Sequence, residues 1–300
     1  MVDFIHNNKD RYGVDAICRI LPIAASTYYR TLDLADNPEH RAKRDLHDEH
    51  HAEQIKRIWK ESSGRYGVRK VWQQLKREGY VIARCTVARL MQKLGIQGVW
   101  RGKNKQTTRS RDDQKRADDL VKRNFSADRP DQLWVSDFTY IQTHSGWVYT
   151  AFIIDVFSRA IVGWKVSTRM NTDMVLDALE QALHDRGMPK NVIHHSDRGV
   201  QYLSIRYTNR LEAANLRASV GTTGDSYDNA LAETVNGLYK TEVIEYLKAD
   251  WQGLADVQLA TLNWVDWFNK KRVHSALGYV SPFEFEAMYY DKINPLGQVA

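Results

Sequence analysis

Three strand patterns that follow one another at hairpin spacing restrict the fold of this chain more than any other feature. Apolar and aromatic residues dominate the runs 134–141, 149–156 and 161–166. The turn residues His144-Ser145-Gly146 separate the first two runs, and Ser158-Arg159 precedes the third. Consecutive strands joined by such short turns form an antiparallel meander. The second half of the chain is therefore expected to be built on a β-sheet.

Helix and strand patterns alternate after the meander. We expect a helix with Thr172 as its N-cap, then a strand at 191–195, a helix near 203–215 and a short strand near 216–220. A last helix carries Glu233. This order of elements is that of an RNase H-like α/β domain, in which a mixed sheet is flanked by helices.

Three carboxylates occupy distinctive positions in that order. Asp137 lies inside the central first strand, Asp197 follows the fourth strand, and Glu233 falls one turn into a helix packed beside them. Most of the 37 acidic residues are expected to be solvated, but an unpaired carboxylate inside an apolar strand is costly to bury. Carboxylate oxygens are ligands for Mg²⁺ or Mn²⁺. Two such ions about 3.5–4 Å apart stabilise the attacking and leaving oxygens of phosphoryl transfer, so the trio predicts an enzyme that cuts and joins nucleic acid.

The net charge of +6 is divided unevenly along the chain. Residues 1–127 carry 27 Lys and Arg against 16 Asp and Glu, whereas residues 128–300 carry 16 against 21. A basic front half suits the neutralisation of DNA phosphates, and an acidic back half suits a metal site. A basic, solvated linker explains part of the charge of the front half but not its helical and aromatic content.

The first 45 residues are expected to form a small region that resembles a helix-turn-helix. Two short helices are expected within 13–30, and Pro22 separates them. The first has an apolar stripe at helical spacing, formed by Val14, Ile17, Cys18 and Leu21. The second would enter the major groove of DNA, although any short helical hairpin gives the same stripe.

Residues 46–100 are expected to form a second helical unit, with Thr86 as the N-cap of its last helix. Apolar stripes along its helices are expected to form a core. The opposite faces are rich in Lys and Arg, including Arg65, Arg69 and Lys70. A charged outward face is usually only solvated, but this density of one sign favours contact with DNA.

Residues 101–126 are expected to be a basic linker that follows the DNA backbone. Its candidate phosphate contacts are Arg101, Lys103, Lys105, Arg109 and Arg111. A flexible, solvated spacer explains the same composition nearly as well. The RNase H-like core with its C-terminal helices is expected at 127–290, and a tail at 291–300.

Composition excludes several classes of protein. No run of 18 apolar residues and no charged-then-apolar leader is present, so we expect a cytoplasmic protein with no membrane partner. The only cysteines, Cys18 and Cys85, have no C-x-x-C partner. They offer neither a disulfide framework nor a zinc ribbon, and both are expected to be small buried hydrophobes.

Five stretches spread over most of the chain form a specific combination. They are Arg65-Tyr66-Gly67, Trp134-x-x-Asp137-x-Thr139-Tyr140, His195-Ser196-Asp197-Arg198-Gly199-x-Gln201-Tyr202, Asp228-Asn229-Ala230 through Glu233, and Asn269-x-x-Arg272-x-His274-x-x-Leu277-Gly278-Tyr279-x-Ser281-Pro282. In these stretches the chain resembles the OrfB-type transposases of bacterial insertion sequences, in the family numbered three. That family belongs to the DDE transposase and retroviral integrase superfamily. The three acids keep its spacing.

The resemblance implies a DNA transposase that cleaves the ends of its insertion sequence and joins the exposed 3′-hydroxyl to DNA. Asp137, Asp197 and Glu233 would be the catalytic and metal-ligating residues, with two Mg²⁺ or Mn²⁺ ions per active site. Lys240 follows Glu233 by seven residues, close to two helical turns, and is expected to contact a phosphate near the scissile bond. His195 and Arg198 are further candidate DNA contacts. Alternatively, His195 is a packed structural histidine, and Arg198 is an ion-pair partner of the acids.

The implied partners are double-stranded DNA, as terminal inverted repeats and target, and further copies of the chain assembled on it. A protein from an upstream reading frame is another implied partner, and the expected location is the bacterial nucleoid. Two rival functions stay open: a non-catalytic DNA-binding accessory or inhibitor of the element, and an RNase H-like nuclease without strand transfer.

Overall fold

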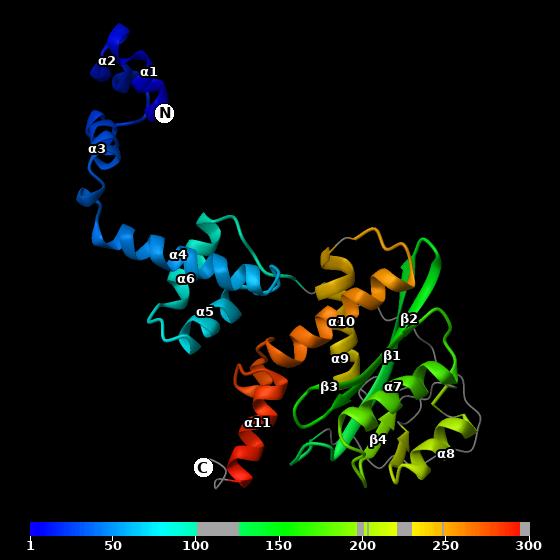
Figure 1. Ribbon diagram of the computed structural model, residues 1–300. Coiled ribbons are helices and arrows are strands. Elements are labelled where there is room, and N and C mark those ends of the chain that lie inside the picture. The colour runs from blue at the N-terminus through cyan, green and yellow to red at the C-terminus, as the bar shows by residue number, and fades with distance from the viewer. Residues whose placement is uncertain (101–125, 197–200, 203, 221–229, 248, 295–300) are drawn as a thin grey trace.

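The computed structural model describes residues 1–100, 126–196, 201–202, 204–220, 230–247 and 249–294. Figure 1 shows a sheet-containing domain with the helices α4 to α6 beside it and the first three helices farther out along the chain. The expected fold class is confirmed, because a mixed sheet flanked by helices is preceded by all-helical regions. None of the helices in the described ranges combines the length and the apolar content needed to cross a membrane.

In the described part of the chain, five strands form the sheet in the order β3-β2-β1-β4-β5. Their bounds are β1 Leu133–Thr143, β2 Gly146–Asp155, β3 Ile161–Ser167, β4 Ile193–Ser196 and β5 Arg217–Val220. The first three pair antiparallel, which confirms the meander, while β4 pairs parallel with both β1 and β5. The central strand is therefore β1, the strand that carries Asp137.

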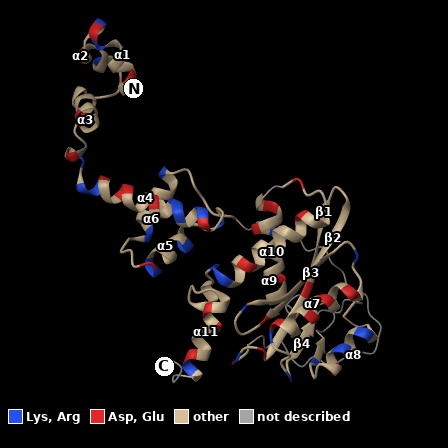
Figure 2. Cartoon of the chain, in the orientation of Figure 1, with Lys and Arg blue, Asp and Glu red and all other residues tan. Residues whose placement is uncertain are grey.

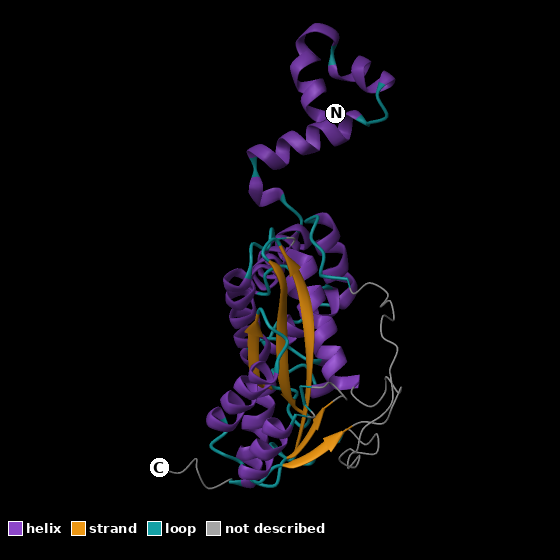
Figure 3. Cartoon of the chain, turned by 90° about the vertical axis from the view of Figure 1, so that its right-hand side faces the viewer, coloured by secondary structure: helices purple, strands orange, loops and turns teal. Residues whose placement is uncertain are grey.

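Helices cover both faces of this sheet (Figure 3). One face packs against α7 Thr172–Asp185 and α8 Ile205–Ala213, and the other against α9 Ala230–Tyr239, η2 Lys240–Glu245 and α10 Leu254–Lys270. Alternate residues of β1 supply the two cores, because successive side chains of a strand point to opposite faces. Trp134 faces α7 and Val135 faces α9.

The two N-caps expected from sequence are wrong by one or more residues. Asn171 caps α7, where its side chain accepts a hydrogen bond from the Met174 backbone N–H at 3.2 Å, so Thr172 is the first helical residue. The helix α6 begins at Arg84, with Ala83 before it and no side-chain cap. A Thr inside the first turn looks like a cap in sequence, since caps and first turns share residue types.

Within the described residues 1–100, six helices and one short 3₁₀ turn precede the sheet. Their bounds are α1 Val2–Tyr12, α2 Val14–Ile20, α3 Ala25–Asp36, η1 Pro38–His40, α4 Lys43–Glu61, α5 Val68–Arg77 and α6 Arg84–Lys93. The first three share a small core of Ile5, Ile17 and Tyr28, and α1 was not expected from its polar sequence. Cys18 is half-buried, but Cys85 is exposed, contrary to expectation.

The unit α4–α6 packs against the segment that follows α10. The Tyr66 hydroxyl accepts a hydrogen bond from the Val273 N–H at 2.8 Å and donates to the Lys271 carbonyl at 3.3 Å. Beneath this contact Arg272 forms a buried ion pair with Glu242 of η2 at 2.6 Å. Burial opposes ionisation of Glu242, but Arg272 outweighs it and lowers the pKa of this carboxyl.

After α10 the described residues form η3 Ser275–Leu277 and α11 Pro282–Ile293. Ser281 and Glu284 form a capping box at the start of α11, which satisfies backbone N–H groups that the helix leaves unpaired. Arg186 fastens α11 to the sheet domain, since its guanidinium bonds both Glu286 and Asp131.

A side chain from α10 hydrogen-bonds the free backbone edge of β3. Asn269 accepts from the Ile161 N–H at 2.9 Å and donates to the Ile161 carbonyl at 2.8 Å, and it is buried. Farther along the strand, Gln181 of α7 accepts from the Trp164 N–H at 2.8 Å. These amides replace the neighbour that an edge strand lacks, and both helices are thereby held to the sheet.

Replacing Asn269 with Ala is expected to destabilise the fold by about 2–4 kcal/mol, because it leaves a buried N–H and a buried carbonyl without partners. Asn263→Ala on the exposed face of the same helix is the matched control and is expected to change stability by less than about 0.5 kcal/mol. Urea unfolding followed by tryptophan fluorescence measures both. Equal midpoints for the two variants would contradict this role of Asn269.

Candidate active site

Asp137 lies on the central strand and faces α9. It is half-buried, and it shares its face of β1 with the core residues Val135 and Ile141. One carboxylate oxygen accepts a hydrogen bond from the Phe138 backbone N–H at 2.8 Å, and the other accepts from the Asn236 side-chain amide at 2.9 Å. Both donors are neutral N–H groups, and together they orient the carboxylate.

The bond from Asn236 brings the Glu233 helix to Asp137. Glu233 and Asn236 lie three positions apart on α9 and therefore on one side of that helix. Asn236 is buried and Glu233 is exposed in the first turn. Two acids separated by 96 positions in sequence thus lie on facing surfaces of a strand and a helix that pack together.

Lys240 begins η2, which follows α9 directly. The helix changes from α to π at this residue, so Lys240 begins a new turn rather than continuing the α-helical face of Glu233. Its ammonium stands 4.8 Å from the centre of the Tyr140 ring. Tyr140 lies three residues beyond Asp137 on β1, so its side chain points to the opposite face of that strand. The contact therefore ties Lys240 to β1, three residues from Asp137 along the strand.

The third predicted acid, Asp197, and its neighbour Arg198 lie outside the described residues. The strand before them is described: β4 ends at Ser196, which pairs with Ser136 of β1 in parallel register. In the described part of the chain no group of three His, Cys, Asp or Glu residues is placed to hold a metal ion. The predicted trio includes one residue beyond that part.

The two histidines of β4 are packed inside the sheet domain. His195 is 1% exposed, and its Nδ1 lies 2.9 Å from the Ser219 hydroxyl of β5. His194 is equally buried, with the Tyr207 hydroxyl 3.1 Å from its Nε2. The position of His195 is that of a packed structural histidine, the alternative that its sequence context left open.

The predicted DNA contacts of the helical unit lie beside the sheet domain. Arg65 donates to the Glu242 carbonyl at 3.0 Å and covers the Trp267 ring, and Arg69 lies 5.8 Å from the centre of the Tyr279 ring. Lys70 is half-buried. Figure 2 shows Lys and Arg along α4, α5 and α6 and again on α8. The linker candidates Arg101, Lys103, Lys105, Arg109 and Arg111 lie outside the described residues.

Sequence reasoning missed one residue of this site, Asn236. An asparagine three positions after a candidate metal ligand on a helix is the available signal, because ligating carboxylates are usually held by a second hydrogen-bonding side chain. It also gave no role to Arg159, or to Arg272 and His274 within their motif. Those three lie around a cavity on the far side of α9.

Comparison with known proteins divides the chain in the same way. An HTH-like domain matches residues 46–104, and two integrase core domain families match residues 127–226 and 214–282. The transposase for insertion sequence element IS629 of Shigella sonnei is 52% identical over 98% of both chains. The transposase InsF for insertion sequence IS3A of Escherichia coli K12 is 31% identical over 94% of this chain and 97% of its own. Among solved structures, the HTLV-2 integrase catalytic core domain in complex with magnesium aligns with a TM-score of 0.44 at 18% identity, covering 54% of this chain and 99% of that chain.

The buried His194 predicts a specific acid sensitivity. Burial, and then the nearby His195, lower the pKa of His194 to about 3. Its neutral form therefore contributes stability that is complete above pH ~6.5, the pKa of the unfolded chain, and is lost as the pH falls below that value. The loss amounts to about 1.4 kcal/mol for each pH unit between the two pKa values.

His194→Gln keeps a partner for the Tyr207 hydroxyl but removes the titrating group. Urea unfolding is expected to show that the wild type loses about 1.4 kcal/mol more than this variant for each pH unit below ~6.5. The exposed His184→Gln serves as the control and should follow the wild type. A His194→Gln variant as acid-sensitive as the wild type would show that His194 is not held neutral.

Proposed function

This chain belongs to the insertion-sequence transposases that join an HTH-like domain to an integrase core domain, and we propose that it cleaves the ends of its own element and joins the freed 3′-hydroxyl to DNA. Asp137 of β1 held by Asn236 of the Glu233 helix is the observation that carries the proposal. Carboxylates that converge from separate elements provide the oxygen ligands that Mg²⁺ or Mn²⁺ requires.

Asp197 would complete the site because it directly follows Ser196, whose partner across the sheet is Ser136. The residue that follows each serine in sequence is an acid, Asp197 after Ser196 and Asp137 after Ser136. Neighbouring parallel strands lie about 4.8 Å apart. This register supports a shared site for the two aspartates, with Glu233 approaching from α9.

Phosphoryl transfer requires the protein to position the reacting groups and to stabilise the developing charge. Two divalent ions, when bound by the three acids, supply activation of the attacking oxygen and stabilisation of the departing one. Asn236 holds the Asp137 carboxylate in a fixed orientation, and Lys240 contacts a phosphate beside the scissile bond. Neither hydrolysis by water nor attack by the 3′-hydroxyl on a target phosphodiester needs a covalent side-chain nucleophile.

Several finer features belong to the same proposal. The DNA would be the terminal inverted repeats and the target, bound by more than one copy of the chain in the bacterial cytoplasm at the nucleoid. A protein from an upstream reading frame would take part in activity. Binding of DNA by Arg65, Arg69 and the linker cations stays a prediction.

The proposal predicts Mn²⁺-dependent cleavage and strand joining with an oligonucleotide that carries the end of the element. Asp137→Asn, Asp197→Asn and Glu233→Gln are each expected to lower both activities about 10³-fold, because several kcal/mol of charge stabilisation is lost. Glu212→Gln, an exposed acid on α8, should leave both unchanged. DNA binding without cleavage by the wild type would favour a non-catalytic accessory protein, and cleavage without joining would favour a simple nuclease.

Asn236→Ala is expected to raise the Mn²⁺ concentration for half-maximal cleavage about tenfold or more, because partners of metal ligands contribute 10–100-fold to affinity or activity. Asn209→Ala, on the exposed face of α8, controls for loss of an asparagine. A positioning role for Asn236 would be contradicted by reduced cleavage with an unchanged Mn²⁺ requirement.

A further inference from the structure

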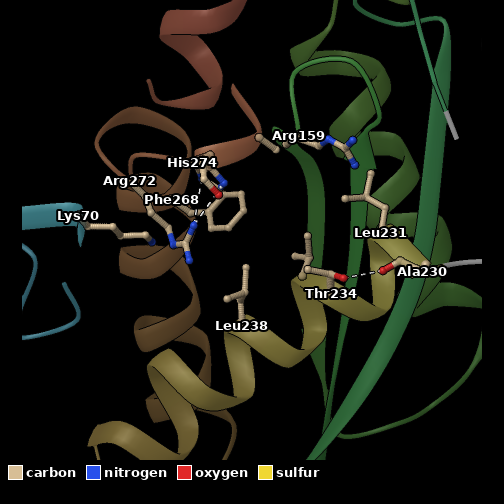
Figure 4. Close-up of a pocket in the computed structure, with 12 residues that line it drawn as sticks. Lys70, Arg159, Ala230, Leu231, Thr234, Leu238, Phe268, Arg272 and His274 are labelled. Atoms are coloured by element: carbon tan, nitrogen blue, oxygen red, sulfur yellow. Dashed lines mark hydrogen bonds between the residues drawn. The ribbon is translucent and has the colours of Figure 1, made fainter. Parts of the chain in front are cut away.

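A cavity of 520 Å³ lies between α9, the segment after α10 and the helical unit α4–α6. Figure 4 shows Leu231, Thr234 and Leu238 of α9 along one side of it, with Lys70 of α5 reaching in from the helical unit. At 3.6 residues per turn these α9 positions lie nearly opposite Glu233 and Asn236. The cavity therefore occupies the other flank of the helix that carries the candidate metal ligand.

Three cations from three parts of the chain line this cavity, and none of the described residues that line it is acidic. Lys70 comes from α5, Arg159 from the turn after β2, and Arg272 from the segment after α10 (Figure 4). Arg272 is compensated by Glu242. Within the described residues neither Lys70 nor Arg159 forms an ion pair. The Lys70 ammonium lies 5.2 Å from the centre of the Tyr66 ring.

These two cations are held at a cost to the free protein. Burial, and then Arg272, lower the pKa of Lys70 to about 7, and burial lowers the pKa of Arg159. Arg159 also has a left-handed backbone, with φ 65°, which few residues other than glycine adopt. Glu242 favours the charged form of Lys70 and Asp155 that of Arg159, but burial has the larger effect on each pKa. Burying a cation is unfavourable, and an anion that entered the cavity would offset this cost.

A second cavity of 750 Å³ adjoins the first and shares Lys70, Leu238, Arg272 and Ser275 with it. Its lining adds Arg65, Arg69 and Trp100, together with Glu242, whose carboxylate is paired with Arg272. Together the two cavities form a groove between the helical unit and the sheet domain in which cations outnumber acids among the described lining residues. A single inorganic ion would fill only part of it, whereas a polynucleotide strand offers phosphates along its length.

We propose that this groove binds the backbone of the DNA on which the transposase acts, with phosphates of one strand held by Lys70 at one side of the cavity and by Arg159 at the other. The inference rests on the proposed function for its choice of DNA as ligand. Lys70 belongs to the helical unit and Arg159 to the sheet domain, so a strand bound by both spans the two. DNA would then enter on one flank of α9 while the acids stand on the other.

Salt dependence of DNA binding by the full chain tests the groove without relying on catalysis. Fluorescence anisotropy of a labelled duplex from the end of the element, measured in EDTA over a range of KCl concentrations, gives the slope of log Kd against log salt. Lys70→Gln and Arg159→Gln are each expected to reduce that slope by about 0.9 and to weaken binding about eightfold near 0.1 M salt, the contribution of one phosphate contact. Arg159→Lys should retain the wild-type slope.

Matched controls separate this site from a general loss of charge. Lys190→Gln and Arg217→Gln remove the same charges from exposed positions near the start of β4 and β5 and should leave slope and affinity unchanged. Thermal unfolding of each variant without DNA shows that it is folded. A photo-crosslinker on Ser275→Cys, in a chain with Cys18→Ser and Cys85→Ser, should attach to the labelled duplex, and Arg159→Gln should reduce the yield.

The inference is overturned if both cavity variants bind DNA with the wild-type slope. It is also overturned if millimolar inorganic phosphate raises the unfolding midpoint of the wild type but not of Arg159→Gln while the DNA slopes stay equal, since the cavity would then hold a small anion. These results are distinct from failure of the proposed function. A wild type that binds DNA through Lys70 and Arg159 but never cleaves it would remove the transferase activity and leave the groove in place.

Discussion

One buried carboxylate, Glu242, joins the parts of this molecule that the candidate functions need. Its side chain bonds Arg272 from the segment after α10 and the Trp264 indole of α10, and its backbone carbonyl accepts from Arg65 of the helical unit. Removing one partner of a buried pair leaves an uncompensated charge and costs about 3–5 kcal/mol. Glu242 lies in η2, directly after α9. Its bonds therefore fix both the end of α9 and the position of the helical unit against the sheet domain.

The helix α9 separates two chemistries. On one flank its Asn236 holds the carboxylate of Asp137, and on the other flank Leu231 and Leu238 line a cavity whose charged residues, among those described, are all cations. Acids that attract divalent ions and cations that attract phosphates would neutralise each other if they mixed. A helix about 10 Å across keeps them apart, while its third face packs Ala232, Val235 and Tyr239 into the core.

Local patterns predicted the sheet domain well because its strands are short, adjacent and joined by tight turns. The meander, the crossing helix and the placement of Asp137 on the central strand followed from periodicity and turn residues. The errors have local causes as well: Asn171 competes with Thr172 for the cap position, and α1 has too few apolar residues to show a stripe. Asn236 escaped notice because its partner on β1 is 99 positions away.

The sequence by itself determined the family and the order of elements in the sheet domain, and it predicted the acidic trio, since these depend on residue types and on spacing over a few turns of chain. Only the tertiary structure decided what surrounds the basic residues. Arg65 and Lys70 look like an outward face in sequence, yet packing of the helical unit on the segment after α10 turns them toward Glu242 and the α9 cavity. Burial and charge compensation depend on contacts between segments some 200 positions apart, and no local pattern of residues encodes them.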